Sequence, residues 1–287
     1  MKIVTRHLIF ILLVAIFTGH ISSIDLFETN GDAHPSITAL LRAFSISAQT
    51  PTQIMKATQK AWLRPAGKER WEVDDIYGAR KAELMPLFKE LGLVEEKKPL
   101  QNSYDYLLLM GALYGRAKSR LEYAVSLACL GINFRTIVIL GSERPLNTQQ
   151  EPESLFFGPD IPKTEFQMMQ WLFEHTLMPT DMYQSTITWI NAPNKIDAQG
   201  KTQRATTADT INLFLDGNFK PGSCLVISNQ PHVEYQASVT RYLLPESFSV
   251  EGVGHALSEK APVSEILDAL ARWIYQEEKL WNKAQHA

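Results

Sequence analysis

Several polar residues follow short apolar runs in the middle of the chain, and their types are suited to chemistry. Gly141, Ser142, Glu143 and Arg144 come directly after the apolar run 136–140. A serine, a carboxylate and a guanidinium in one place are costly to bury unless they have partners or a ligand. We interpret this group as part of a candidate site, with a salt bridge from Glu143 or Arg144 to the N-terminal region as the structural alternative.

The turn after the run 104–110 holds residues suited to an anion. Gly111 lets the backbone approach a ligand at the start of a helix, and the guanidinium of Arg116 can hold a phosphate through two hydrogen bonds. The spacing is not G-x-G-x-x-G, so it indicates a dinucleotide only weakly. In the structural alternative the glycine makes the turn and the arginine pairs with a neighbouring carboxylate.

Amide and imidazole side chains follow two further runs. Asn191 comes after the run 186–190, and Asn229 and His232 come after the run 223–228. A histidine can act as a general acid or base because its usual pKa lies near neutrality. A lone histidine is more often a hydrogen-bonded surface or core residue, so both interpretations stay open.

The helix expected at 206–215 begins next to an arginine. Thr207 suits a helix start, and Asp209 lies in the first turn, where the helix dipole favours a carboxylate whatever its function. Capping does not require Arg204, so we take it as a ligand-binding candidate. We expect Arg64, in the N-terminal region, to contribute little to binding.

The apolar runs indicate the fold that must position these residues. Each is short, rich in Ile, Leu and Val, and followed by a helix-like segment; the five runs are 104–110, 136–140, 186–190, 223–228 and 248–253. Such runs are typical of strands buried on both faces. We therefore predict an α/β fold with a doubly wound, mostly parallel, five-stranded Rossmann-like sheet. Ligands bind outside the carboxyl ends of such strands, so the residues named above should share one rim.

The chain divides into two structural regions after its first residues. Residues 101–287 are predicted to form the Rossmann-like domain, and residues 25–100, which contain no strand-like run, a helical cap packed on it. Cys129 and Cys224 lie among apolar neighbours, so we expect two buried free thiols rather than a disulfide. The sequence contains no P-loop, Gly-x-Ser-x-Gly elbow or metal motif, so the cofactor stays unknown.

The first residues are typical of export. Lys2 and Arg6 precede the apolar run 8–17, which is about half the length of a membrane span, and small polar residues follow. Residues 1–23 are predicted to be a signal peptide, or an uncleaved anchor at the outer face of the inner membrane. The protein would be periplasmic, with membrane association through this segment only. A net charge of -3 gives no basic stripe, so nucleic acid is not an expected partner.

Residues 104–255 carry a further pattern. Its pieces are Tyr-Asp-Tyr-Leu-Leu-Leu-Met-Gly at 104–111, Ile-Val-Ile-Leu-Gly-Ser-Glu-Arg-Pro-Leu at 137–146, Thr-Glu-Phe at 164–166, Arg-Ala-Thr-Thr-Ala-Asp-Thr at 204–210 and Ile-Ser-Asn-Gln-Pro-His-Val at 227–233. This region resembles the SanA/YdcF-like family of bacterial envelope-associated proteins, and Gly111, Gly141, Thr207 and His232 match positions of its pattern. The resemblance implies a Rossmann-like fold, a small phosphorylated or nucleotide-like ligand, and a role linked to the cell envelope.

Two functions from different classes fit these observations. In the first, an exported transferase or hydrolase holds a small anionic ligand with Arg116, Arg144 and Arg204, uses Glu143 or Asp209 as base, and exchanges a proton through His232. In the second, the same site serves a non-catalytic binding or envelope-assembly factor, because fold alone does not fix chemistry. A convergent cluster with a perturbed histidine favours the enzyme.

The export hypothesis is tested with a reporter. A reporter that works only outside the cytoplasm, fused after residue 30, should be active, because the basic start and apolar core direct export. Enzyme assays on intact and fractionated cells provide the measurement. Full activity from a reporter that works only in the cytoplasm would overturn the hypothesis.

Overall fold

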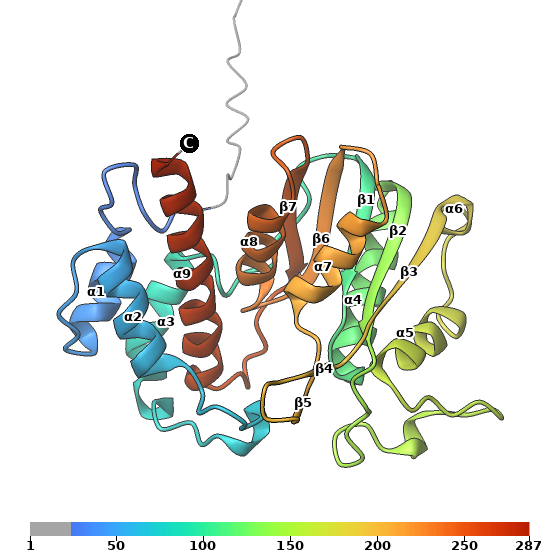
Figure 1. The fold of residues 1–287 in the computed structure, drawn as a ribbon, viewed down its shortest axis with the longest axis horizontal. Helices are drawn as coiled ribbons and strands as arrows, with labels where there is room; N and C mark the ends of the chain where they lie inside the picture. Colours follow the sequence, from blue (N-terminus) through green and yellow to red (C-terminus); the bar gives the residue numbers. More distant parts are fainter. Residues whose placement is uncertain (1–23, 287) are drawn as a thin grey trace, which may run out of the picture.

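The computed structural model describes residues 24–286, so the expected signal peptide or anchor at 1–23 lies outside the described residues. The described chain forms an α/β fold with a five-stranded, all-parallel sheet in the order β3-β2-β1-β6-β7 (Figure 1). This confirms the doubly wound, Rossmann-like fold. The helices of this part of the chain include none whose length and apolar character would suit a membrane crossing.

The strands follow the five apolar runs closely. They are β1 (Ser103–Met110), β2 (Asn133–Ser142), β3 (Thr186–Ala192), β6 (Ser223–Asn229) and β7 (Ser249–His255). The central strands β1, β2 and β6 are buried, as expected for a sheet covered on both faces. The prediction of burial was wrong for β3 and β7, which lie at the edges and are only partly covered.

Helices cover both faces of the sheet. Alternate residues of β1 show this: Leu107 and Leu109 join the core with α4 (Tyr114–Cys129), α5 (Glu165–Glu174) and α6 (Thr180–Gln184). Leu108 and Met110 pack in the opposite core, with α7 (Thr207–Asp216), and α8 (Val233–Leu243) covers β6 and β7. Each strand-helix-strand connection returns to a parallel strand, so all strands end at the same edge.

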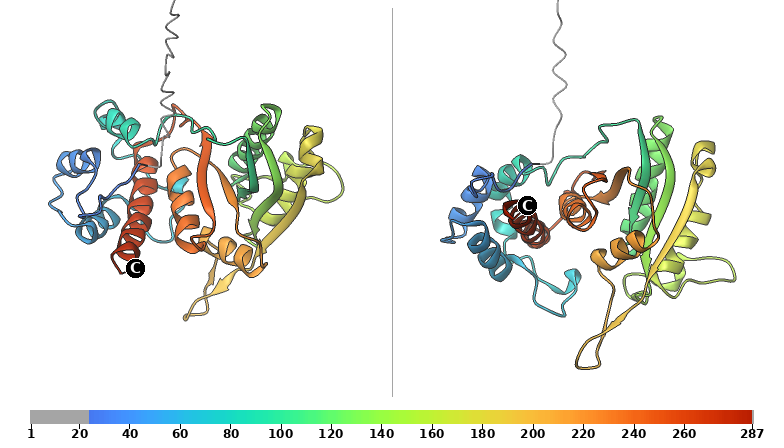
Figure 2. Two further views of the ribbon diagram at one scale, coloured as in Figure 1. Left: turned by 90° about the horizontal axis from the view of Figure 1, so that it is seen from above. Right: turned by 45° about the horizontal axis from the view of Figure 1, so that its top comes forward.

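The N-terminal region is helical, and its core includes a helix from the far end of the chain. It contains α1 (Pro35–Ala43), α2 (Pro51–Trp62), α3 (Lys81–Glu90) and the 3₁₀ turns η1 (Arg70–Glu72) and η2 (Gly78–Arg80). These helices pack around α9 (Val263–Gln285), which lies between them and α8 (Figure 2). α9 therefore belongs by sequence to the α/β region and by packing also to the cap.

Two connecting segments contain short elements of their own. The polar segment after β3 contains a short hairpin, β4 (Lys195–Ile196) and β5 (Thr202–Gln203), which projects beside the sheet (Figure 2). The loop after β2 includes the 3₁₀ turn η3 (Glu153–Leu155). Cys129 and Cys224 are both free. Cys224 is buried, but Cys129, the last residue of α4, is exposed, so the expectation of two buried thiols was wrong for Cys129.

The packing of α9 in the shared core predicts that substitutions there lower the stability of the fold. Leu270→Ala should lower the free energy of unfolding by about 2 to 5 kcal/mol, because Leu270 is fully buried among the cap helices. Leu130→Ala, at a side chain that is 79% exposed, should change it by less than about 0.5 kcal/mol. Urea denaturation followed by circular dichroism measures both. Equal effects of the two substitutions would show that α9 is not part of a packed core.

Candidate functional site

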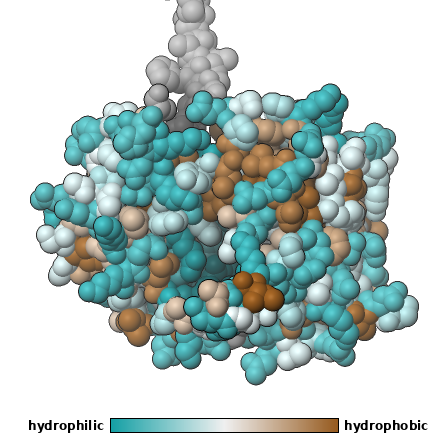
Figure 3. Space-filling view, in the orientation of Figure 1, coloured by the Kyte–Doolittle hydropathy of each residue, from teal (hydrophilic) through white to brown (hydrophobic). Residues whose placement is uncertain are grey.

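A cavity of about 530 Å³ lies at the carboxyl ends of the strands, between the sheet and the N-terminal region. Figure 3 shows a hollow among hydrophilic side chains near the middle of the molecule. The cavity wall contains three carboxylates, from Glu69, Glu165 and Glu265, and seven arginines. The arginines are Arg64, Arg70, Arg116, Arg120, Arg144, Arg204 and Arg272. A concave wall with this excess of positive charge attracts anions.

Residues predicted from the strand ends supply much of this wall. Seven of them line the cavity: Gly111, Arg116, Ser142, Arg144, Arg204, Thr207 and His232. They come from four separate parts of the chain, namely the β1–α4 turn, the end of β2, the start of α7 and the start of α8. They meet because parallel strands end at one edge of the sheet.

Five predicted residues do not line the cavity: Gly141, Glu143, Asn191, Asp209 and Asn229. At Gly141 a Cβ atom would lie 2.9 Å from the Cα of Phe166, so the glycine permits close packing of α5 on β2. Asn191 pairs in register with Gly141 and is exposed at the end of β3. These two positions therefore shape the sheet edge without contacting the cavity.

The two carboxylates predicted as bases are held by local structure. The exposed Glu143 accepts a hydrogen bond from the backbone N–H of Asn194, at 3.3 Å. Asp209 completes a capping box with Thr206 at the start of α7 and pairs with Lys195. Burial raises the pKa of Asp209, but the hydrogen bonds from Lys195 and Thr206 lower it overall. The geometry therefore offers neither carboxylate to a ligand in the cavity.

Arg120 is the most enclosed cation of the wall, with 2% of its surface exposed. Its Nε and Nη2 donate to Asn229 Oδ1 at 3.0 and 2.9 Å, and its Nη1 donates to the carbonyls of Met110 and Gly111 at 2.9 and 2.8 Å. All four contacts are to neutral acceptors, and no carboxylate among residues 24–286 pairs with it. Burial, with the charge of Arg116, lowers the pKa of Arg120 to about 9, so it stays charged at neutral pH.

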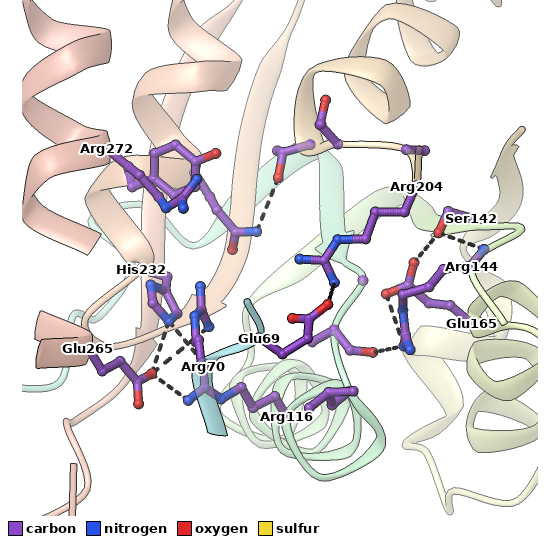
Figure 4. A pocket seen from close by; sticks show the side chains of 18 of the residues that line it. Glu69, Arg70, Arg116, Ser142, Arg144, Glu165, Arg204, His232, Glu265 and Arg272 are labelled. Atoms are coloured by element: carbon purple, nitrogen blue, oxygen red, sulfur yellow. Dashed lines mark hydrogen bonds and ion pairs between the residues drawn. The ribbon is translucent and has the colours of Figure 1, made fainter. Parts of the chain in front are cut away.

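Glu265, in the first turn of α9, lies close to two arginines and a histidine from three other elements (Figure 4). It pairs with Arg116 of α4 and lies 4.0 Å from Arg70 of η1 and 3.2 Å from His232 at the start of α8. Burial raises the pKa of Glu265, but the hydrogen bond with His232 and the charges of Arg116 and Arg70 lower it to about 2. Glu265 is therefore ionised over the whole physiological range.

His232 lies between a donor and an acceptor. Its Nε2 is 2.9 Å from Arg116 Nη1 and 3.2 Å from Glu265 Oε1, while its enclosed Nδ1 has no partner within the described residues. Burial and the charge of Arg70 hold the pKa of His232 well below its usual value, despite the hydrogen bond with Glu265. The ring is thus neutral at pH 7 and adds no charge to the cavity.

A second charged group lies at the opposite wall. Ser142 Oγ donates to Glu165 Oε2 at 2.5 Å and accepts the backbone N–H of Arg144 at 3.3 Å. The Arg144 guanidinium binds both oxygens of the buried Glu151, at 2.7 and 3.1 Å, and lies 3.6 Å from Glu165. Arg144 is therefore neutralised by Glu151, a residue of the long loop after β2. The sequence had suggested that Arg144 would be free to hold a ligand, and the structure shows it engaged.

Cations from the cap and α9 complete the wall, and the sequence gave no reason to expect them there. Arg64 lies 3.7 Å from Asp268, and Arg272 donates to Asp268 at 3.0 Å, so two arginines share one buried carboxylate. Arg204 reaches Glu69 across the cavity, at 3.1 Å. Arg64 lines the cavity, and its small contribution to binding stays a prediction. Only the packing of α9 against the cap reveals these neighbours.

The residues that the structure describes include no group of His, Cys, Asp and Glu that would hold a metal ion. Comparisons with protein-family models, with curated proteins and with solved structures find no match to this chain. The function must therefore be argued from the chemistry of the cavity.

The low pKa of Glu265 predicts a pH effect on stability. A carboxyl whose pKa is about 2 in the folded state, against 4.5 ordinarily, stabilises the fold above pH 4.5 and loses this contribution as the pH falls towards 2. Glu265→Gln should lower the free energy of unfolding at pH 7 by about 3 kcal/mol.

Chemical denaturation from pH 7 to pH 2 measures this effect. The difference between Glu265→Gln and the parent should shrink as the pH falls, because the parent carboxylate becomes protonated. Glu246→Gln, at an exposed glutamate, is the matched control. A difference that stays constant with pH would contradict the electrostatic origin.

Proposed function

We propose that this protein binds a small phosphorylated ligand, with the phosphate seated at the arginines of the cavity. The observation that carries the proposal is Arg120, an enclosed guanidinium without a carboxylate partner among the described residues. A buried charge is costly unless it is compensated. Its four hydrogen bonds use four of the five N–H groups of an arginine, which leaves one on Nη2 for a ligand oxygen.

The charge of the cavity supports a dianion. The wall contains seven arginines and three carboxylates. Two further carboxylates outside the wall, Glu151 and Asp268, pair with wall arginines, so five negative charges face seven positive ones. With His232 neutral, two positive charges remain uncompensated. A phosphate monoester carries a charge of about -1.5 to -2 at neutral pH and matches this surplus better than a single carboxylate would.

The placement of the site supports the same ligand class. Gly111, Thr207 and His232, at the starts of α4, α7 and α8, line the cavity. Helix N-termini at the carboxyl edge of a parallel sheet suit phosphate groups. These residues also belong to the segments that resemble the SanA/YdcF-like family, and we infer from that resemblance and from the first residues that the protein is exported and acts at the cell envelope.

The alternative function is a non-catalytic binding or envelope-assembly factor. This function needs the same ligand in the same cavity, so a binding measurement does not distinguish it from an enzyme. Turnover of the bound phosphorylated ligand distinguishes the two. Mass spectrometry of small molecules retained by the purified protein identifies the natural ligand for either function.

Removal of one cavity cation should weaken binding. Arg204→Ala should weaken the binding of inorganic phosphate by about 2 kcal/mol, or roughly thirtyfold in Kd, through loss of a charge-assisted hydrogen bond. The side chain is 47% exposed, so the fold should tolerate the change. Isothermal titration calorimetry with phosphate provides the measurement.

Arg135→Ala is the matched control. Arg135 is exposed near the amino end of β2, at the edge of the sheet opposite the cavity, and its removal changes the net charge equally. It should leave the Kd unchanged. Failure of the parent to bind phosphate, or equal weakening by both substitutions, would refute the proposed site.

A further inference from the structure

The Glu165 carboxylate has one oxygen that is held and one that is open. Oε2 accepts the hydrogen bond from Ser142 Oγ at 2.5 Å. Oε1 accepts no hydrogen bond from residues 24–286, and the closest cation, Arg144 Nη2, lies 3.6 Å away. Glu165 lines the cavity, and its Oε1 is not fully enclosed by the protein. This oxygen is therefore accessible from the cavity. Its position suits contact with a bound molecule.

Several contacts fix this carboxylate in place. Glu165 is the first residue of α5, and its backbone N–H donates to the carbonyl of Arg144 at 2.9 Å, which ties the helix to the end of β2. At Gly111 a Cβ atom would lie 3.0 Å from Glu165 Cδ, so the glycine makes room for the carboxylate. Arg144 is engaged by both oxygens of Glu151, so its ion pair with Glu165 is the longer one, at 3.6 Å and without a hydrogen bond.

The other carboxylates of the wall are less suited to accept a proton. Glu265 has a pKa of about 2, and Glu69 pairs with Arg204. Burial, by contrast, raises the pKa of Glu165 despite the nearby charge of Arg144. A general base works best when its pKa lies close to the ambient pH. Carboxylates whose environments shift their pKa values apart are typical of acid-base sites.

We propose that Glu165 is the general base of a phosphomonoester hydrolase, activating water for attack on the phosphate that the cavity arginines hold. This inference rests on the proposed phosphate site and adds a reaction to it. Water forms the new P–O bond while Glu165 Oε1 takes one of its protons. The bond from phosphorus to the ester oxygen breaks, and that oxygen leaves with the electron pair. It finally receives the proton from Glu165, which restores the carboxylate and yields an alcohol and inorganic phosphate.

Ser142 acts in this mechanism as a positioning residue. Ser142 is 2% exposed. Its Oγ donates to Glu165 and accepts from the backbone N–H of Arg144, so the hydroxyl is already held as both donor and acceptor. A covalent phosphoserine at Ser142, detected by mass spectrometry after reaction, would overturn direct attack by water.

Two probes test the base: hydrolysis of p-nitrophenyl phosphate, and loss of ¹⁸O from labelled inorganic phosphate into water, followed by mass spectrometry. Glu165→Gln, which keeps the shape and the contact with Ser142, should reduce both rates about a hundredfold or more. The parent kcat/KM should fall as the pH is lowered through the raised pKa of Glu165, and the variant should lack this limb. Glu153→Gln, at an exposed glutamate, is the matched control and should resemble the parent.

Calorimetry with inorganic phosphate separates this inference from the proposed function. Glu165→Gln should bind phosphate as tightly as the parent or more tightly, because a negative charge has been removed from the wall. If the parent does not bind phosphate, the proposed function itself fails. If the parent binds phosphate but turns over neither probe, or if Glu165→Gln retains the parent rates, the binding site stands and the hydrolase is refuted.

Discussion

The ion-pair group at Glu265 is the interaction on which the arrangement of the cavity depends. The carboxylate sits at the start of α9 and contacts Arg116 of the α/β body, lies near Arg70 of the N-terminal region, and meets His232 at the start of α8. One anion thus fixes the relative positions of four elements. Without it, two arginines would face each other in a wall that already carries excess positive charge, and the repulsion would work against closure of the cavity.

The residues at the carboxyl edge of the sheet could be predicted from the sequence, because the pattern that marks them lies within a few neighbouring residues. Short runs of Ile, Leu and Val mark strands, and a polar residue after each run marks the edge, so Gly111, Ser142 and His232 were placed together without a structure. The other half of the wall has no such signal. Arg70 and Arg272 lie in ordinary charged helical segments, and only the packing of α9 between the cap and α8 turns them towards the sheet.

The sequence also could not show which carboxylate contacts the cavity. Glu143 and Asp209 follow sequence signals of a site, yet a loop contact and a helix cap fully account for their positions. Glu165 was not named as a candidate, and its hydrogen bond with Ser142 joins residues 23 positions apart. Sequence position tells which residues begin a helix, but tertiary contact decides which of them meets a ligand.

The bridge between Arg204 and Glu69 gives the cavity an internal competitor. Glu69 belongs to the N-terminal region and Arg204 to the segment that enters α7, so two side chains of the cavity wall neutralise part of its charge. An anion that approaches the Nη1 group of Arg204 must compete with this carboxylate. Weakly charged solutes such as chloride gain too little from the exchange, whereas a multivalent group gains more. The bridge therefore favours ligands that carry more than one negative charge over monovalent ions.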